Sequence, residues 1–129
     1  MKRTPLKTSY RYFNLSLADP RQSWSARNEA ELVIAISAWQ DRVKCVGGKQ
    51  TYEIDIAEAQ HESFGARERH ENLKWALKHC AGLVRIVIAI AKDQRAKRRE
   101  VADSFPQKKL VMRITHFDEV TRMFRLEAV

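Results

Sequence analysis

The most continuous run of apolar residues in the chain is Leu83–Ala91, in which only Arg85 is charged. Successive residues of a strand point to opposite faces of a sheet, and both alternating sets of this run are mostly apolar. Gly82 precedes the run and Lys92 follows it. The pattern predicts a central strand that is buried on both faces and covered by the rest of the domain.

Alternating apolar and polar positions predict further strands on either side of this run. Residues 9–17 alternate, with aromatic side chains among them, and this favours a strand. Residues 42–46 and 49–56 alternate around Gly47 and Gly48, which supply the positive φ angles of a two-residue hairpin turn. Residues 108–117 and 123–129 predict a second hairpin around a turn at 118–122.

Residues 29–40 are rich in apolar side chains and have two interpretations. Asn28 with Glu31 three residues later has the spacing of a capping box, which favours a helix. The β-branched cluster Val33, Ile34 and Ile36 favours a strand. We favour the strand and leave the helix open.

One stretch has clear helical periodicity, at residues 66–80, and Ala81 and Gly82 provide a stop after it. We expect this helix to pack across the sheet. A short helix is also predicted over residues 99–105, ended by Pro106. At helical spacing, one side of this helix carries Arg69, Leu73, Ala76, Leu77 and Cys80.

The predicted elements indicate an α+β fold, with a curved, mostly antiparallel sheet of about six strands and one main helix packed on it. We expect a single globular domain at residues 9–129 after a flexible basic arm at residues 1–8. The layout is analogous to small, partly closed barrels of the PUA-like kind. The analogy concerns the layout alone, because no motif of the chain supports it.

The composition agrees with one ordered domain and indicates the cellular compartment in which we expect it. The chain has 129 residues, of which 44% are hydrophobic and 31% charged. The two cysteines, Cys45 and Cys80, form neither a disulfide framework nor a CxxC motif, so we expect a reducing cytoplasm. The basic N-terminus is not followed by an apolar signal segment, and no stretch is long enough for a membrane span, so no membrane association is expected.

The charge of the chain favours a polyanionic partner. Its formal net charge is +8, from 24 Lys and Arg against 16 Asp and Glu. The densest basic segment, residues 92–99, follows the predicted central strand, and we expect two lysines after Pro106 to extend it into one continuous patch. The predicted phosphate contacts are Lys92, Arg95, Lys97, Arg98, Arg99, Lys108 and Lys109.

A tryptophan in a polar segment is the candidate for contacts with bases. Trp24 stands between Ser23 and Ser25, and stacking on an aromatic face is how proteins hold unpaired bases. We expect Trp24 and Arg27 to line one base-accepting or ligand-accepting pocket. Trp39 is predicted to lie in the core.

Motifs of catalysis are scarce. The chain has no G-x-S-x-G elbow, phosphate loop, dinucleotide fingerprint or HExxH arrangement, and we expect no cofactor. His70 and His79 are nine residues apart on the predicted helix and point in nearly opposite directions. Asp55, Glu58 and His61 stand near a strand end, where carboxylates of this kind bind Mg²⁺ in nucleases.

The sequence therefore predicts a small, basic, non-enzymatic module that binds DNA or RNA. One alternative is a protein-interaction module, such as a regulator or inhibitor of an acidic partner. A metal-dependent nuclease is the less favoured alternative. The sequence leaves open the choice between DNA and RNA, the reading of a modified base, the oligomeric state and the presence of a catalytic partner.

Overall fold

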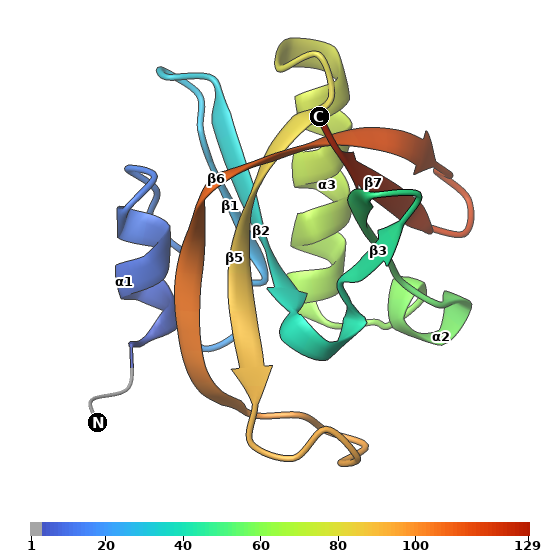
Figure 1. Cartoon of the computed structure of the whole chain (residues 1–129). Coiled ribbons are helices and arrows are strands. Elements are labelled where there is room, and N and C mark those ends of the chain that lie inside the picture. Colours follow the sequence, from blue (N-terminus) through green and yellow to red (C-terminus); the bar gives the residue numbers. More distant parts are fainter. Residues whose placement is uncertain (1–3) are drawn as a thin grey trace.

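The computed structural model describes residues 4–129, which form one seven-stranded sheet and its covering helices (Figure 1). The strand order is β1-β2-β5-β6-β7-β4-β3. β2 and β5 run parallel, and every other neighbouring pair is antiparallel. The elements are α1 (Leu6–Arg11), β1 (Ser25–Asn28), β2 (Val33–Trp39), the 3₁₀ helix η1 (Gln40–Arg42), β3 (Lys44–Val46), β4 (Lys49–Glu53), α2 (Ile56–Ala59), α3 (Phe64–His79), β5 (Leu83–Ala91), β6 (Val101–Phe117) and β7 (Phe124–Ala128).

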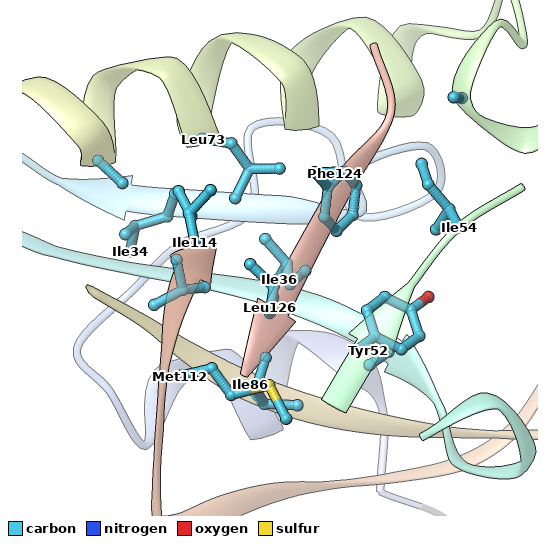
Figure 2. Close-up of a cluster of buried hydrophobic side chains, with 14 of the residues drawn as sticks. Ile34, Ile36, Tyr52, Ile54, Leu73, Ile86, Met112, Ile114, Phe124 and Leu126 are labelled. Carbon is cyan, nitrogen blue, oxygen red and sulfur yellow. The ribbon is translucent and has the colours of Figure 1, made fainter. Parts of the chain in front are cut away.

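The predicted central strand is confirmed as β5, which lies between β2 and β6 and is covered on both faces (Figure 1). Val84 and Ile86 belong to the larger core, which packs against Leu73 of α3. Val87, which points to the other face, packs with Tyr10 in a smaller core under α1. Figure 2 shows the larger core between α3 and the strands. Complete burial of each such side chain contributes about 1.5–3 kcal/mol to the free energy of unfolding.

The sheet bends along β6, the longest strand (Figure 1). Its first part pairs with β5 and its last part with β7. Between them the register shifts, because Pro106 faces Val87 whereas Val111 faces Arg85. Such a bulge bends a strand and increases its twist. The sheet still has two edges, β1 and β3, so it is open where a partly closed barrel was considered.

The α+β class with a single bent sheet is confirmed, and so are several elements. The sheet has seven strands where about six were predicted. Gly47 and Gly48, with φ of +59° and +80°, join β3 to β4 as the predicted hairpin requires. The second hairpin is formed by β6 and β7. The main helix, α3, begins two residues before its predicted start and ends one residue before its predicted end.

The segment with two interpretations contains the strand β2. Asn28 and Glu31, which have the spacing of a capping box, do form a hydrogen bond: the Glu31 backbone N–H donates to Asn28 Oδ1 at 3.1 Å. This bond lies in a turn and not at the start of a helix. Leu32 then has a φ of +56°, which a helix does not permit. The segment forms a strand because it pairs in parallel with β5 and buries side chains on both faces of the sheet.

Three predictions near the N-terminus and β6 differ from the structure. The strand predicted at 9–17 is wrong: its first residues belong to α1, and Tyr10 of this helix is buried together with Phe13, which follows the helix. Of the predicted arm, residues 1–3 lie outside the described part, while the Thr4 backbone N–H donates to Asp103 Oδ1 at 2.7 Å. The short helix predicted at 99–105 is also wrong, because pairing with β5 extends β6 back to Val101 and Pro106 lies at its bulge.

In residues 4–129, no helix combines the length and apolar character that crossing a membrane requires.

Candidate ligand cavity

A cavity of about 540 Å³ opens where the start of α3 meets one end of the sheet. Trp24 lies just before β1, Trp39 ends β2, Tyr52 comes from β4 and Arg69 from α3, and all four line the cavity. Arg99, in the loop before β6, completes one side. Small-molecule sites are commonly cavities of about 300–1,000 Å³ with aromatic walls and a few polar groups. The cavity has the size and the lining of such a site.

Trp24 is fixed by its backbone and by a close approach to α3. Its carbonyl oxygen accepts a hydrogen bond from the Ser37 backbone N–H at 2.9 Å and another from the Tyr10 hydroxyl at 3.0 Å. Its ring lies against the first turn of α3 at Gly65, where an added Cβ would be 2.9 Å from two ring carbons. The tryptophan occupies this place because residue 65 has no side chain.

Arg69 is a buried charge on the wall of the cavity. The residue is 3% exposed, and its guanidinium carbon lies 5.0 Å from the Trp24 ring centre and 5.2 Å from that of Phe124. Its Nη1 lies 3.5 Å from Glu58 Oε1. The other carboxylate oxygen of Glu58 accepts a hydrogen bond from Arg42 Nη1 at 2.7 Å. Glu58 thus faces two arginines and Arg69 is held between two rings.

Tyr52 brings a buried hydroxyl to the same cavity. The residue is 1% exposed, and its hydroxyl has no hydrogen-bond partner among residues 4–129. Its pKa is raised to about 12, mainly by burial and also by the charge of Glu58, while the charge of Arg69 opposes the rise. The Trp39 backbone N–H also lowers the pKa but does not reach hydrogen-bonding geometry. In Figure 2 the hydroxyl points away from Leu126 in the core.

Arg99 anchors the basic loop and does not extend into solvent. Its Nη1 and Nη2 donate to the two carboxylate oxygens of Asp41 at 2.7 and 2.9 Å, and Nη2 also donates to the Gln94 carbonyl at 2.8 Å. Its guanidinium carbon lies 5.2 Å from the Trp39 ring centre. The hydrogen bonds from Arg99 hold the pKa of Asp41 below its ordinary value. Arg99 therefore ties the loop to the end of β2, and its predicted role in binding phosphate does not fit this geometry.

The remaining predicted cations divide into two groups. Lys92, Arg95, Lys97 and Arg98 are exposed on the loop that follows β5, and Arg99 and Glu100 of this loop line the cavity. Lys92 also lies near Glu100, with an Nζ to Oε2 distance of 3.5 Å. The end of this loop therefore borders the cavity, and we call the loop, with its four exposed cations, the rim.

Lys108 and Lys109 lie at the bulge of β6, between the residues that face Val87 and Arg85. They are separated from the end of β5 by at least four strand positions, about 13 Å at 3.3 Å per residue. The Nζ of Lys108 lies 5.1 Å from the Tyr12 ring centre. The two lysines do not continue the loop into one patch as the sequence suggested, because residues 101–106 form a strand between them and the loop.

Arg27, expected beside Trp24, lines a different hollow. Its guanidinium carbon lies 5.1 Å from the Trp75 ring centre, and it pairs with Glu29 at 3.8 Å. β1 runs alongside α3, so Trp24 meets the first turns of the helix and Arg27 meets its last turns. Of the two residues predicted to share a pocket, only Trp24 lines the cavity.

Sequence reasoning missed several lining residues. Trp39, which the sequence predicts in the core, is half-buried and lines the cavity. For Tyr52 the sequence predicts only an alternating position in a hairpin. The signal for Arg69 was present, because an arginine on the core-facing side of a helix is rarely buried without a partner.

The residues proposed for a nuclease metal site serve other purposes. Asp55 caps α2 by accepting a hydrogen bond from the Glu58 backbone N–H at 2.8 Å. The Glu58 side chain faces two arginines, and the His61 ring lies 6.1 Å from that of Trp24. In the part of the chain that the structure describes, no group of three or more His, Cys, Asp or Glu side chains is placed to hold a metal ion.

Comparisons of the chain with protein-family models, with curated proteins and with solved structures find no match. The case for a function therefore rests on the cavity and its basic rim.

Proposed function

We propose that this protein is a non-enzymatic nucleic-acid-binding module that holds an unstacked base in the cavity while the rim contacts phosphates. The observation that carries the proposal is the position of the exposed basic loop beside an aromatic-walled cavity of about 540 Å³. Bases taken out of a stack are held by aromatic side chains and by hydrogen bonds to their edges. Phosphates next to the base would meet Arg95, Lys97 and Arg98.

The distribution of charge supports this arrangement. The chain carries a formal net charge of +8. Two of the arginines at the cavity, Arg69 and Arg99, have carboxylate partners, whereas Arg95, Lys97 and Arg98 are exposed and have no ion pair among residues 4–129. Exposed cations release counterions when they meet phosphates, and this gives affinity without sequence preference.

The proposal extends to the layout and the setting. A bent sheet with a helix on its concave side and a cavity at one end is analogous to PUA-like barrels, an analogy of layout alone. The free cysteines Cys45 and Cys80 suit a reducing compartment such as the cytoplasm.

The test is a fluorescence-anisotropy titration of the protein with short single-stranded and double-stranded DNA and RNA at several salt concentrations. We expect affinity to fall steeply as salt rises, and the salt slope to shrink in the double variant Lys97→Glu/Arg98→Glu. Lys44→Glu/Lys49→Glu, a double reversal of exposed charges in the β3–β4 hairpin, changes the net charge by the same amount; it is the matched control and should change binding little.

Two results would contradict the proposal. Absence of binding to all four nucleic acids at low salt would exclude it and would direct attention to the alternative of an acidic protein partner. Equal loss of affinity in the rim variant and in Lys44→Glu/Lys49→Glu would show binding by net charge alone, without a role for the rim.

A further inference from the structure

We infer that the cavity selects an oxo base, in which a carbonyl oxygen stands next to a ring N–H, as in guanine, thymine and uracil. This inference rests on the proposed function, because it names which bases the site accepts. Its basis is a group of three side chains on the cavity wall: Tyr52, Arg69 and Glu58.

Two of these side chains offer donors that the protein itself leaves unused. The Tyr52 hydroxyl is buried and has no hydrogen-bond partner in the described chain. The Arg69 guanidinium has five N–H donors, and within residues 4–129 its polar contact is the ion pair with Glu58 at 3.5 Å. A carbonyl oxygen has two lone pairs, so one such oxygen can accept from both residues.

Glu58 provides the matching acceptor. Its Oε2 is engaged by Arg42 at 2.7 Å, whereas its Oε1 has only the longer contact with Arg69. A carboxylate oxygen accepts about two hydrogen bonds, so Oε1 can take a ring N–H that stands beside the carbonyl. An oxo edge therefore satisfies both the donors and the acceptor.

Adenine fits the same wall less well. Its ring nitrogens have one lone pair each, so they cannot accept from Tyr52 and Arg69 together, and it has no carbonyl oxygen. One buried donor would stay unpaired in its complex, and an unpaired buried group costs binding. Neutral cytosine has a carbonyl oxygen but no ring N–H beside it, so Glu58 would have no donor to accept from.

The experiment uses single-stranded oligonucleotides whose backbone is abasic except for one central base. Guanine, adenine, thymine or uracil, or no base is placed there, in both deoxyribose and ribose backbones. The phosphate contacts are the same in every probe, so differences in affinity report the cavity alone. We expect guanine and thymine or uracil to bind about 10-fold more tightly than adenine, a difference of about 1.4 kcal/mol.

Tyr52→Phe is the diagnostic variant. It removes a hydroxyl that has no partner in the described chain, so the fold should not depend on it. We expect it to reduce the preference for guanine over adenine at least threefold and to leave affinity for the abasic probe unchanged. Tyr12→Phe, at a residue that is 52% exposed, is the matched control and should keep the preference.

The outcomes separate the inference from the proposed function. Adenine binding as tightly as guanine would overturn the inference, while salt-dependent binding of all probes would still support a phosphate-contacting rim. An unchanged preference in Tyr52→Phe would likewise overturn the assignment of the hydroxyl. Absence of binding to every probe and to ordinary oligonucleotides would overturn both.

Discussion

Replacement of Gly65 by alanine should move Trp24 and thereby damage the cavity. An alanine Cβ would lie 2.9 Å from two carbons of the Trp24 ring and closer still to the backbone oxygen of Gln22. Contacts of this length are well inside the usual van der Waals separation of about 3.5–4.0 Å. Because one of the obstacles is backbone, the segment before β1 must shift as a whole.

The size of the effect follows from two opposing contributions. Overpacking of this kind costs about 1–3 kcal/mol. Alanine is favoured over glycine inside a helix by up to about 1 kcal/mol, and Gly65 is the second residue of α3, where the gain is smaller. We therefore expect the free energy of unfolding to fall by about 1–2 kcal/mol.

Urea unfolding and the anisotropy titration together check this prediction. Gly65→Ala should lower the midpoint and should weaken binding of a probe with one central base more than binding of the abasic probe. Arg67→Ala, an exposed change in the same turn of α3, is the control and should stay within about 0.5 kcal/mol of the original protein. A Gly65→Ala variant with unchanged stability and unchanged base binding would refute the placement of Trp24 against the helix.

Two other contacts around the cavity can be tested by single substitutions. Asp41→Asn should lower the free energy of unfolding by about 1–3 kcal/mol at pH 7, because Arg99 loses a bidentate carboxylate. Since Arg99 lowers the pKa of Asp41 below 3.8, the ionised pair stabilises the fold above that pH and is lost as the pH falls through the lowered pKa. The difference in urea midpoint between the two proteins should therefore shrink below about pH 4, and a constant difference would contradict the ion pair. Tyr10→Phe should cost about 1–2 kcal/mol, because its hydroxyl makes two hydrogen bonds, whereas Tyr52→Phe should cost nothing measurable. Thermal unfolding of the two variants side by side checks this contrast, and equal destabilisation would mean that the Tyr52 hydroxyl has a partner in the folded protein.

Elements whose sequence pattern agrees with their tertiary pairing were predictable. The apolar run of β5, the Gly47-Gly48 turn and the periodicity of α3 each have a local cause that the fold preserves. The strand predicted at residues 9–17 was wrong because the spacing of its apolar residues is compatible with a strand and with a helix. The packing of Tyr10 in the smaller core favours the helix. The helix predicted at 99–105 was wrong because the helical preference of that segment is weak, and the segment pairs with the long strand β5.

The cavity was harder to predict than the fold because its residues come from distant parts of the chain. Trp24, Trp39, Tyr52, Arg69 and Arg99 share no motif, and their meeting depends on the order of the strands. The polar surroundings of Trp24 were a usable signal, because the side chain does line the cavity. The basic run at residues 92–99 was also visible, but nothing in the sequence showed that its last arginine turns inward to a carboxylate.

The energetics of Arg69 favour a ligand-binding interpretation of the cavity over a purely structural one. Removing a guanidinium from water costs several kcal/mol, and the contact that offsets this cost is a single ion pair at 3.5 Å with a carboxylate that Arg42 already neutralises. The rings of Trp24 and Phe124 add about 0.5–2 kcal/mol each through cation–π interaction. An apolar side chain of similar volume would fill the space at less cost, so stability alone does not account for an arginine there. A bound group with acceptors at its edge would give the unused donors of Arg69 their partners, and the unpaired hydroxyl of Tyr52 on the same wall indicates the same need.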